Sequence, residues 1–270
     1  MSDISFGQYY PAKSFVHKCD PRLKIVFLIV YIAAIFLSTT FASLGICALI
    51  FFLTVLLSKV PFKSLLRSMK AILFLLMFTV VLNLFFNQGE KVLFEWQFIK
   101  TTQEGLYNAG FVALRLFLLV LGSSMLTLTT TPVSLTDGVE SLLKPLTFLR
   151  FPVHEFALIM SLALRFIPIL TDETARIMNA QKARGTDFET GSLLQRAKAI
   201  VPILIPLLIS AFRRAEELSD AMDSRCYSGS KVRTKYKKLA FSWRDFLALC
   251  VGAALLATVI FLRTSGLPLF

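Results

Sequence analysis

Two arginines of the chain, Arg184 and Arg225, each stand between two small residues. The two triplets are Ala183-Arg184-Gly185 and Ser224-Arg225-Cys226. An arginine guanidinium is permanently charged, and its five N–H donors form a planar fork that fits carboxylate oxygens. Small neighbours allow another surface to approach such a side chain closely. The pattern therefore predicts recognition of acidic groups on a partner, not the making or breaking of bonds.

Each triplet ends a segment with the pattern of a long amphipathic helix. From Phe156 to Arg184, apolar residues recur at steps of mostly three or four, with polar residues opposite them. The segment 192–225 repeats this design, because an apolar half precedes a strongly charged half. Gly185 is a favourable helix stop, and an arginine in the last turn interacts well with the negative end of the helix dipole.

Two interpretations of the arginines are open at this point. A single arginine near a helix C-terminus is commonly a helix cap. The duplication favours a docking surface with two points, which would fit a partner with two equivalent acidic grooves. Weaker contacts are expected from four acidic residues near the tips, namely Asp187, Glu217, Asp220 and Asp223.

The composition places these helices in a membrane protein. Apolar residues make up 56 % of the 270 residues and charged residues only 17 %, whereas soluble domains average about 45–50 % and about 25 %. The mean hydropathy is +0.69. We expect an all-α integral membrane protein and exclude an ordinary soluble enzyme or a disordered chain. The net charge of +12 then indicates orientation and contact with anionic lipids, not binding of nucleic acid.

The remaining reactive residues predict no catalytic centre, metal site or cofactor. The four cysteines are scattered without a short metal-binding spacing, and there are only two histidines. No glycine-rich phosphate loop is present, so any ATP would be handled by another chain.

Runs without charge define five expected membrane spans. The uncharged run 25–58 would be about 51 Å long as one helix, against a hydrocarbon core of about 30 Å, so we expect two helices with a turn within 38–43. The first four spans are expected at about 23–40, 42–58, 71–89 and 112–131. They form a membrane domain over 1–136, followed by a cytoplasmic coupling-helix domain over 137–240 and a C-terminal span within 241–270.

The charges between these spans predict the orientation of the chain. Basic residues dominate before the first span, between the second and third, and after the fourth, including a basic run at 231–238. The other connections are poor in basic residues. The positive-inside rule then predicts a cytoplasmic N-terminus and an extracellular C-terminus in the plasma membrane.

Motifs along nearly the whole chain resemble the transmembrane T components (EcfT, CbiQ-like family) of prokaryotic energy-coupling factor vitamin transporters. The motifs are Tyr10-Pro11-Ala12-Lys13-Ser14 with His17, Asp20-Pro21-Arg22, Asn83–Phe86, Leu128–Pro132, Leu164–Pro168, Ala180–Phe188, Arg213–Leu218 and Ala221–Tyr227. Members of that family often have Ala-Arg-Gly at the second tip as well. Ser224 and Cys226 depart from this pattern but are also small.

The resemblance implies a non-catalytic scaffold in an ATP-driven importer. Such a component joins two cytosolic ATP-binding-cassette (ABC) ATPases to a membrane-embedded, vitamin-binding S component. Its two coupling helices cross, and their arginine tips enter grooves on the ATPases. The resemblance thus assigns the docking role to Arg184 and Arg225 and their small neighbours.

Two other classes of membrane protein are weighed against this one. A self-sufficient secondary transporter or channel should carry ionisable or helix-breaking sites at mid-membrane, often in two similar halves. A membrane-embedded enzyme should carry a cluster of His, Asp or Glu at one depth. The uncharged runs hold neither feature, and the repeat lies outside them.

Overall fold

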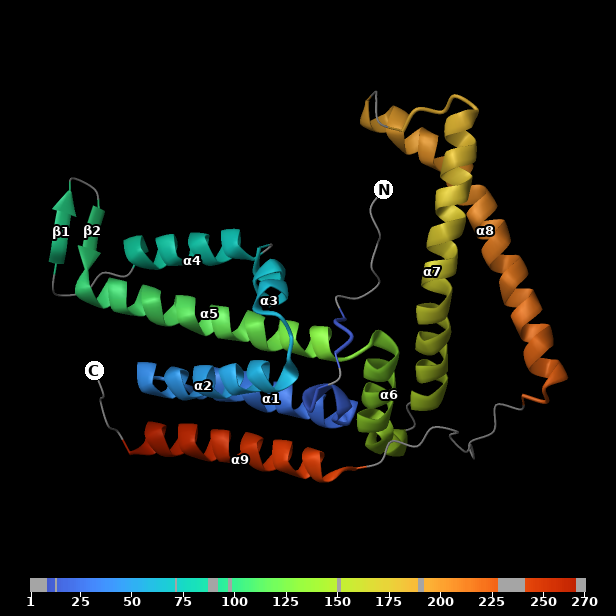
Figure 1. Ribbon diagram of the computed structural model, residues 1–270. Helices are drawn as coiled ribbons and strands as arrows, with labels where there is room; N and C mark the ends of the chain where they lie inside the picture. Colours follow the sequence, from blue (N-terminus) through green and yellow to red (C-terminus); the bar gives the residue numbers. More distant parts are fainter. Residues whose placement is uncertain are drawn as a thin grey trace. The chain divides into compact units, whose positions relative to one another are not determined.

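The computed structural model describes residues 9–12, 14–70, 72–86, 92–96, 99–149, 152–188, 192–227 and 241–265. The chain forms two compact units, Met1–Val153 with Leu239–Phe270, and His154–Lys238 (Figure 1). The basic run at 231–238, Lys13, and residues 90, 91, 97 and 98 of the connection after the third expected span lie outside the described residues.

The first unit is a bundle of helices. Its helices are α1 (Pro21–Leu37), α2 (Phe41–Ser58), α3 (Phe62–Met69), α4 (Leu73–Phe86), α5 (Gln103–Thr129), α6 (Pro132–Leu143) and α9 (Trp243–Thr264), with short 3-10 helices at Val16–Lys18 and Lys144–Leu149. The predicted helical fold class is confirmed. A small antiparallel hairpin, β1 (Val92–Trp96) with β2 (Ile99–Thr102), connects α4 to α5 and was not predicted.

The uncharged run 25–58 folds as two helices, as predicted. Helix α1 ends at Leu37 and α2 begins at Phe41. The Ser43 hydroxyl lies 3.3 Å from the Thr40 amide, from which it accepts, and 2.7 Å from the Thr40 carbonyl oxygen, to which it donates. The bond to the Thr40 amide satisfies a donor at the start of the helix that has no partner within the helix.

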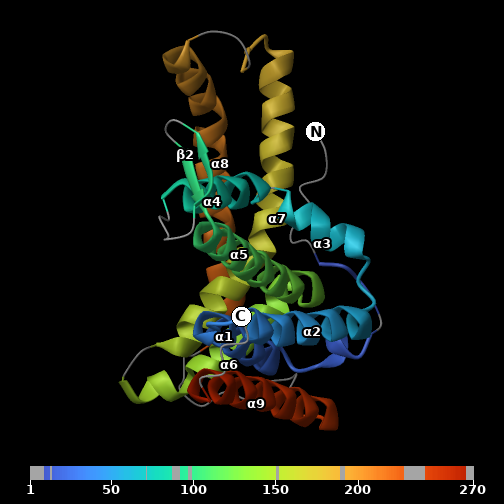
Figure 2. The ribbon, with the colours of Figure 1, turned by 90° about the vertical axis from the view of Figure 1, so that its left-hand side faces the viewer.

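Helix α1 lies at the centre of the first unit, between α9, α5 and α6 (Figure 2). The Ile35, Leu44 and Leu255 side chains come from three different helices and are almost completely buried. Gly122 of α5 allows a close approach to α1, because a Cβ at this position would lie 2.6 Å from Cε1 of Tyr31. Packing of this kind, rather than the hydrophobic effect, is what holds helices together in a lipid environment.

The outer surface of the first unit is apolar. On α4, for example, Phe74 is 81 % and Met77 67 % exposed. By length and composition, the helices Phe41–Ser58, Gly105–Thr129, Leu194–Ser224 and Trp243–Thr264 could each cross a membrane. The other two expected spans are shorter, since α1 has 17 residues and α4 has 14.

The second unit consists of two long helices. Helix α7 runs over Val153–Ala183 and α8 over Leu193–Ser224, so both predicted long helices are confirmed. Neither Pro168 in α7 nor Pro202 and Pro206 in α8 ends its helix. The segment that contains α8 was expected on the cytoplasmic side. By length and composition, however, α8 as one continuous helix could also cross a membrane.

Candidate functional site

The first arginine triplet forms the C-terminal cap of α7. The Thr186 amide donates to the Gln181 carbonyl at 3.1 Å, and the Gly185 amide donates to the Lys182 carbonyl at 3.0 Å. These two bonds define a Schellman motif, in which the residue after the cap takes the left-handed conformation. Gly185 is that residue, with a φ of 87°. Arg184 is therefore the last residue before the chain turns away from the helix.

The second triplet forms the same cap on α8. The Tyr227 amide donates to the Met222 carbonyl at 3.0 Å, and the Cys226 amide donates to the Asp223 carbonyl at 2.9 Å. Cys226 occupies the left-handed position, with a φ of 57°. Arg225 thus has the same position in its cap as Arg184 has in the first. The similarity of the two triplets in sequence is also a similarity in backbone geometry.

Both tips are open to solvent. All six triplet residues are exposed, and within the described residues neither the Arg184 nor the Arg225 guanidinium has a hydrogen-bond or ion-pair partner. The two tips lie at opposite ends of the helix pair, since α7 ends where α8 begins (Figures 1 and 2). The structure therefore does not bring the two arginines into one site. It presents two separate cationic points.

The four acidic residues expected to make weaker contacts are also exposed. Asp187 follows the α7 tip by three positions. Glu217, Asp220 and Asp223 lie within about one third of the circumference of α8, because each residue of a helix turns the chain by about 100°. They form an acidic strip that leads to the α8 tip.

Arg115 is a partly buried charge whose role was not predicted, although it falls within the fourth expected span. It lies inside α5, and its Nη2 donates to the Ser38 carbonyl at 2.6 Å, at the turn between α1 and α2. Its guanidinium carbon lies 4.7 Å from the centre of the Phe111 ring. A charge flanked by apolar residues within a helix is the signal that could have revealed it. Its contacts make it a cap for the end of α1.

Two further polar residues, Asp245 and Lys24, lie at the opposite end of α1. Asp245 is 1 % exposed, and its two carboxylate oxygens accept from the Asp20 amide at 2.9 Å and the Ser242 amide at 2.7 Å. The Lys24 ammonium donates to the Thr129 carbonyl at 3.0 Å, at the C-terminus of α5. Lys24 therefore caps another helix, whereas its charge was expected only to contribute to the orientation of the chain.

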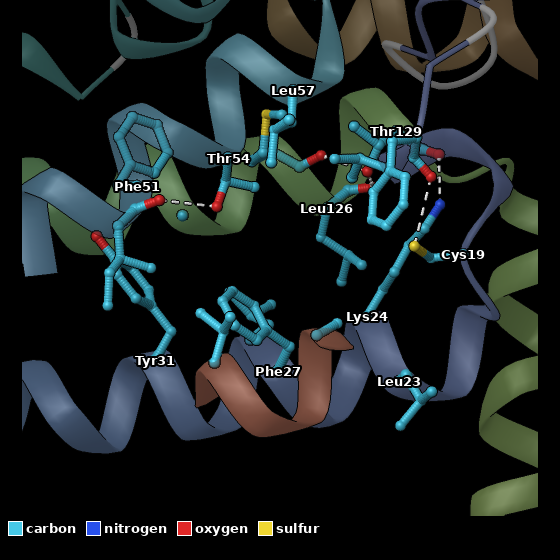
Figure 3. A pocket seen from close by; sticks show the side chains of 18 of the residues that line it. Cys19, Leu23, Lys24, Phe27, Tyr31, Phe51, Thr54, Leu57, Leu126 and Thr129 are labelled. Atoms are coloured by element: carbon cyan, nitrogen blue, oxygen red, sulfur yellow. Dashed lines mark hydrogen bonds between the residues drawn. The ribbon is translucent and has the colours of Figure 1, made fainter. Parts of the chain in front are cut away.

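A cavity of about 170 Å³ lies between α1, α2, α5 and α9. Figure 3 shows Lys24, Cys19 and Thr129 at one end and Tyr31 at the other. None of the described residues that line it is a carboxylate or a histidine. Such a lining does not supply the paired acid and base groups of a hydrolytic centre. Elsewhere in the described part of the chain, no cluster of three or more His, Cys, Asp or Glu side chains could hold a metal ion.

These features define a helical, multi-pass membrane protein whose candidate site is a pair of exposed cationic helix tips. Residues 12–236 match the CbiQ family, which is described as cobalt transport protein. The chain is 49 % identical over 249 residues to the energy-coupling factor transporter transmembrane protein EcfT of Clostridium kluyveri, covering 92 % of each chain. It is 45 % identical to the EcfT of Ruminiclostridium cellulolyticum, covering 97 % of each, and 42 % identical to that of Bacillus subtilis, covering 97 % of this chain and 99 % of the relative.

The chain therefore belongs to the CbiQ family, and it is a transmembrane T component of the energy-coupling factor type. The predicted family and its general function are confirmed.

Proposed function

We propose that this chain is the non-catalytic coupling subunit of an ATP-driven vitamin importer. It links two cytosolic ABC ATPases to a membrane-embedded S component that binds the vitamin. Substrate choice then belongs to the S component, and ATP hydrolysis belongs to the ATPases. The observation that carries the proposal is the pair of identical caps that expose Arg184 and Arg225 at opposite ends of one helix pair.

Each arginine docks into an acidic groove on one ATPase. The small residues Ala183, Gly185, Ser224 and Cys226 allow the groove to close around the guanidinium, and no side-chain partner within the described chain competes for it. Desolvated arginine–carboxylate pairs at interfaces typically cost about 2–5 kcal/mol when one partner is removed. The acidic residues Asp187, Glu217, Asp220 and Asp223 add weaker polar contacts at the rim.

Motion passes from the ATPases to the membrane through α7 and α8. When the ATPases close on ATP and reopen, the two tips are displaced, and the long helices carry this displacement along their length. The exposed apolar side chains of α8, such as Ile205 and Phe212, pass the motion to the S component. We place 1–136 and 241–270 in the membrane and 137–240 on the cytoplasmic side, although the length and composition of α8 also allow its apolar half to enter the bilayer.

The orientation in the membrane follows from the charges of the connections. Lys59, Lys63 and Lys70 lie between the second and third spans with no acidic residue among them. This pattern supports a cytoplasmic N-terminus and an extracellular C-terminus in the bacterial plasma membrane, with basic residues in contact with anionic lipid.

Co-purification tests the docking role. A tagged chain is expressed with candidate ABC ATPases as wild type and as Arg184→Glu with Arg225→Glu. We expect the wild type to retain both ATPases and the double variant to lose them while it remains monodisperse in detergent. A matched control, Arg263→Glu, reverses an exposed arginine of α9 near the C-terminus, which is extracellular in the proposed orientation, and should retain the ATPases. Equal retention by wild type and tip variant would refute docking through the arginines.

Reconstitution separates this function from a self-sufficient transporter. In liposomes, the chain alone should move no vitamin, whereas the complex with ATPases and an S component should do so only with ATP. Substrate movement by the chain alone would reject the coupling role.

A further inference from the structure

Helices α7 and α8 carry opposite charges at equivalent positions. The sequence offset that relates Arg184 to Arg225 also relates other residues of the two helices. Apart from the two arginines, every equivalent pair in which both members are charged has the sign reversed. The reversed pairs are Glu155 with Arg196, Asp172 with Arg213, Glu173 with Arg214, Arg176 with Glu217, and Lys182 with Asp223.

The reversed pairs are densest in one segment, about three turns before the tips. This segment spans 172–176 in α7 and 213–217 in α8. The repeat therefore preserves the positive charge at the tips and inverts the charges that precede them.

One of the reversed pairs brings the two helices into contact. The Nη2 atom of Arg214 lies 3.3 Å from Oε2 of Glu173, and each side chain is only 31 % exposed. The Ser210 hydroxyl lies 3.5 Å from the Nε atom of Arg214 and helps to orient the guanidinium. The contact thus joins equivalent positions of the repeat, in the segment where the reversed charges are densest.

Charge inversion is what two similar helices need in order to pair with each other. When two copies of one helix design pack around an approximate two-fold axis, equivalent positions near the axis face one another. Identical charges at those positions would repel, whereas inverted charges attract and disfavour pairing of α7 with α7 or of α8 with α8 from another copy. The charges around the Glu173–Arg214 contact meet this requirement.

The contact also sets two equal distances. Glu173 precedes Arg184 by the same number of positions as Arg214 precedes Arg225. At about 1.5 Å per residue, each tip lies about 16 Å along its helix from the contact. The two helix segments between the contact and the tips therefore have the same length.

We propose that the Glu173–Arg214 ion pair fixes α7 and α8 to each other at equivalent points. The position of one tip relative to the other is then fixed, and both tips lie at the same distance from the ion pair. The two residues are positioning residues and do not themselves dock to a partner. The consequence for coupling rests on the docking function proposed above, whereas the pairing of the helices does not depend on it.

Distance measurements by electron paramagnetic resonance test the pairing in the full chain in lipid nanodiscs without ATPases. Spin labels are attached at Ala180→Cys and Ala221→Cys, two exposed and equivalent positions between the ion pair and the tips, after replacement of the four native cysteines by serine. We expect Glu173→Arg and Arg214→Glu each to shift and broaden the distance distribution. The double reversal, Glu173→Arg with Arg214→Glu, should restore the distribution of the unreversed chain.

The matched control is Glu216→Arg, because Glu216 is exposed on the same turn of α8 and its equivalent position in α7 is the uncharged Ala175. It should leave the distances unchanged. In co-purification, each single reversal should weaken ATPase retention about 2- to 5-fold, as expected for a partly exposed ion pair, and the double reversal should recover it.

Two results would overturn the proposal. One is an unchanged distance distribution in both single variants, and the other is a double reversal that fails to restore it. If the wild type retains no ATPases while the spin-label distances change as expected, the docking function is rejected. The proposed pairing of the helices is then still supported.

Discussion

Gly185 and Cys226 hold the same left-handed backbone position, one residue beyond the arginine that ends each long helix. Their φ angles are 87° and 57°, and each amide closes the same hydrogen bond of a Schellman motif. Glycine adopts this conformation without steric cost, whereas other residues are disfavoured there by roughly 1–2 kcal/mol. The α8 tip is therefore built with more backbone strain than the α7 tip.

Replacing Cys226 by glycine should relieve this strain. The gain is reduced by the greater freedom of glycine in the unfolded chain, so we expect about 0.5–1 kcal/mol of local stabilisation. Hydrogen exchange of the Cys226 and Tyr227 amides should slow about 2- to 5-fold. The converse substitution, Gly185→Cys, should speed exchange of the Gly185 and Thr186 amides. Equal exchange rates in wild type and Cys226→Gly would show that the left-handed position carries no strain.

The separation of the two tips predicts that they act together in binding. Arg184→Ala and Arg225→Ala should each weaken retention of the ATPase pair, because one anchor remains in each case. The double substitution should weaken it by more than either single change, since the second contact of a bivalent complex forms at a high effective concentration. Titration of the ATPases over the chain captured on a sensor surface gives the apparent Kd values for binding. A single substitution as damaging as the double one would contradict two equivalent anchors.

Asp245 should be the most sensitive carboxylate of the first unit. Asp245→Ala leaves the buried amide of Asp20 and the part-buried amide of Ser242 without acceptors, which we expect to cost about 2 kcal/mol or more. Asp245→Asn keeps one acceptor and should be milder. Thermal unfolding in detergent measures both, with Asp220→Ala as an exposed control. Equal unfolding temperatures for Asp245→Ala and the control would refute the role of this carboxylate.

Gly122 should tolerate no side chain where α5 meets α1. A Cβ at this position would lie 2.6 Å from Cε1 and 2.9 Å from Cδ1 of Tyr31, so the ring or a helix must move. We expect Gly122→Ala to destabilise the first unit by about 1–3 kcal/mol, as for other overpacked cores. Gly45→Ala is the matched control, because a Cβ there meets nothing within 4 Å. Thermal unfolding should separate the two variants, and equal values would argue against the close approach.

His17 should make the N-terminal segment sensitive to acid. Burial lowers the pKa of His17, with a smaller contribution from the Lys24 charge. Its Nε2 atom donates to the Tyr10 carbonyl at 3.0 Å, and its Nδ1 atom lies 2.7 Å from the Ser14 hydroxyl. The folded state disfavours the charged imidazole, so the neutral form of His17 stabilises the fold. This contribution is complete above the pKa of histidine in the unfolded chain, about 6.5. It is lost as the pH falls through the lower pKa that His17 has in the folded chain.

Stability should therefore decrease from pH 7 to pH 5 more in the wild type than in His17→Gln. Unfolding temperatures of both proteins at each pH provide the measurement. Parallel pH profiles would show that His17 does not titrate with folding.

Much of the architecture was predictable because its signals are local. An uncharged run too long for one span requires two helices, and apolar residues at three- and four-residue steps predict the long helices α7 and α8. The repeat of small residues around Arg184 and Arg225 identified the candidate tips for the same reason, since a helix cap depends on a few consecutive residues. The short hairpin between α4 and α5 lacked the compact turn signal that would have predicted it.

The amino-acid sequence by itself determined the membrane class, the helical fold, the family and the two arginine tips. Only the tertiary structure decided which polar groups meet. The Asp20 amide and the Asp245 carboxylate are 225 residues apart in the chain, Arg115 reaches the turn at Ser38, and Arg214 reaches Glu173 across two helices. Such contacts depend on how helices pack against each other, and no spacing within a single helix specifies that packing.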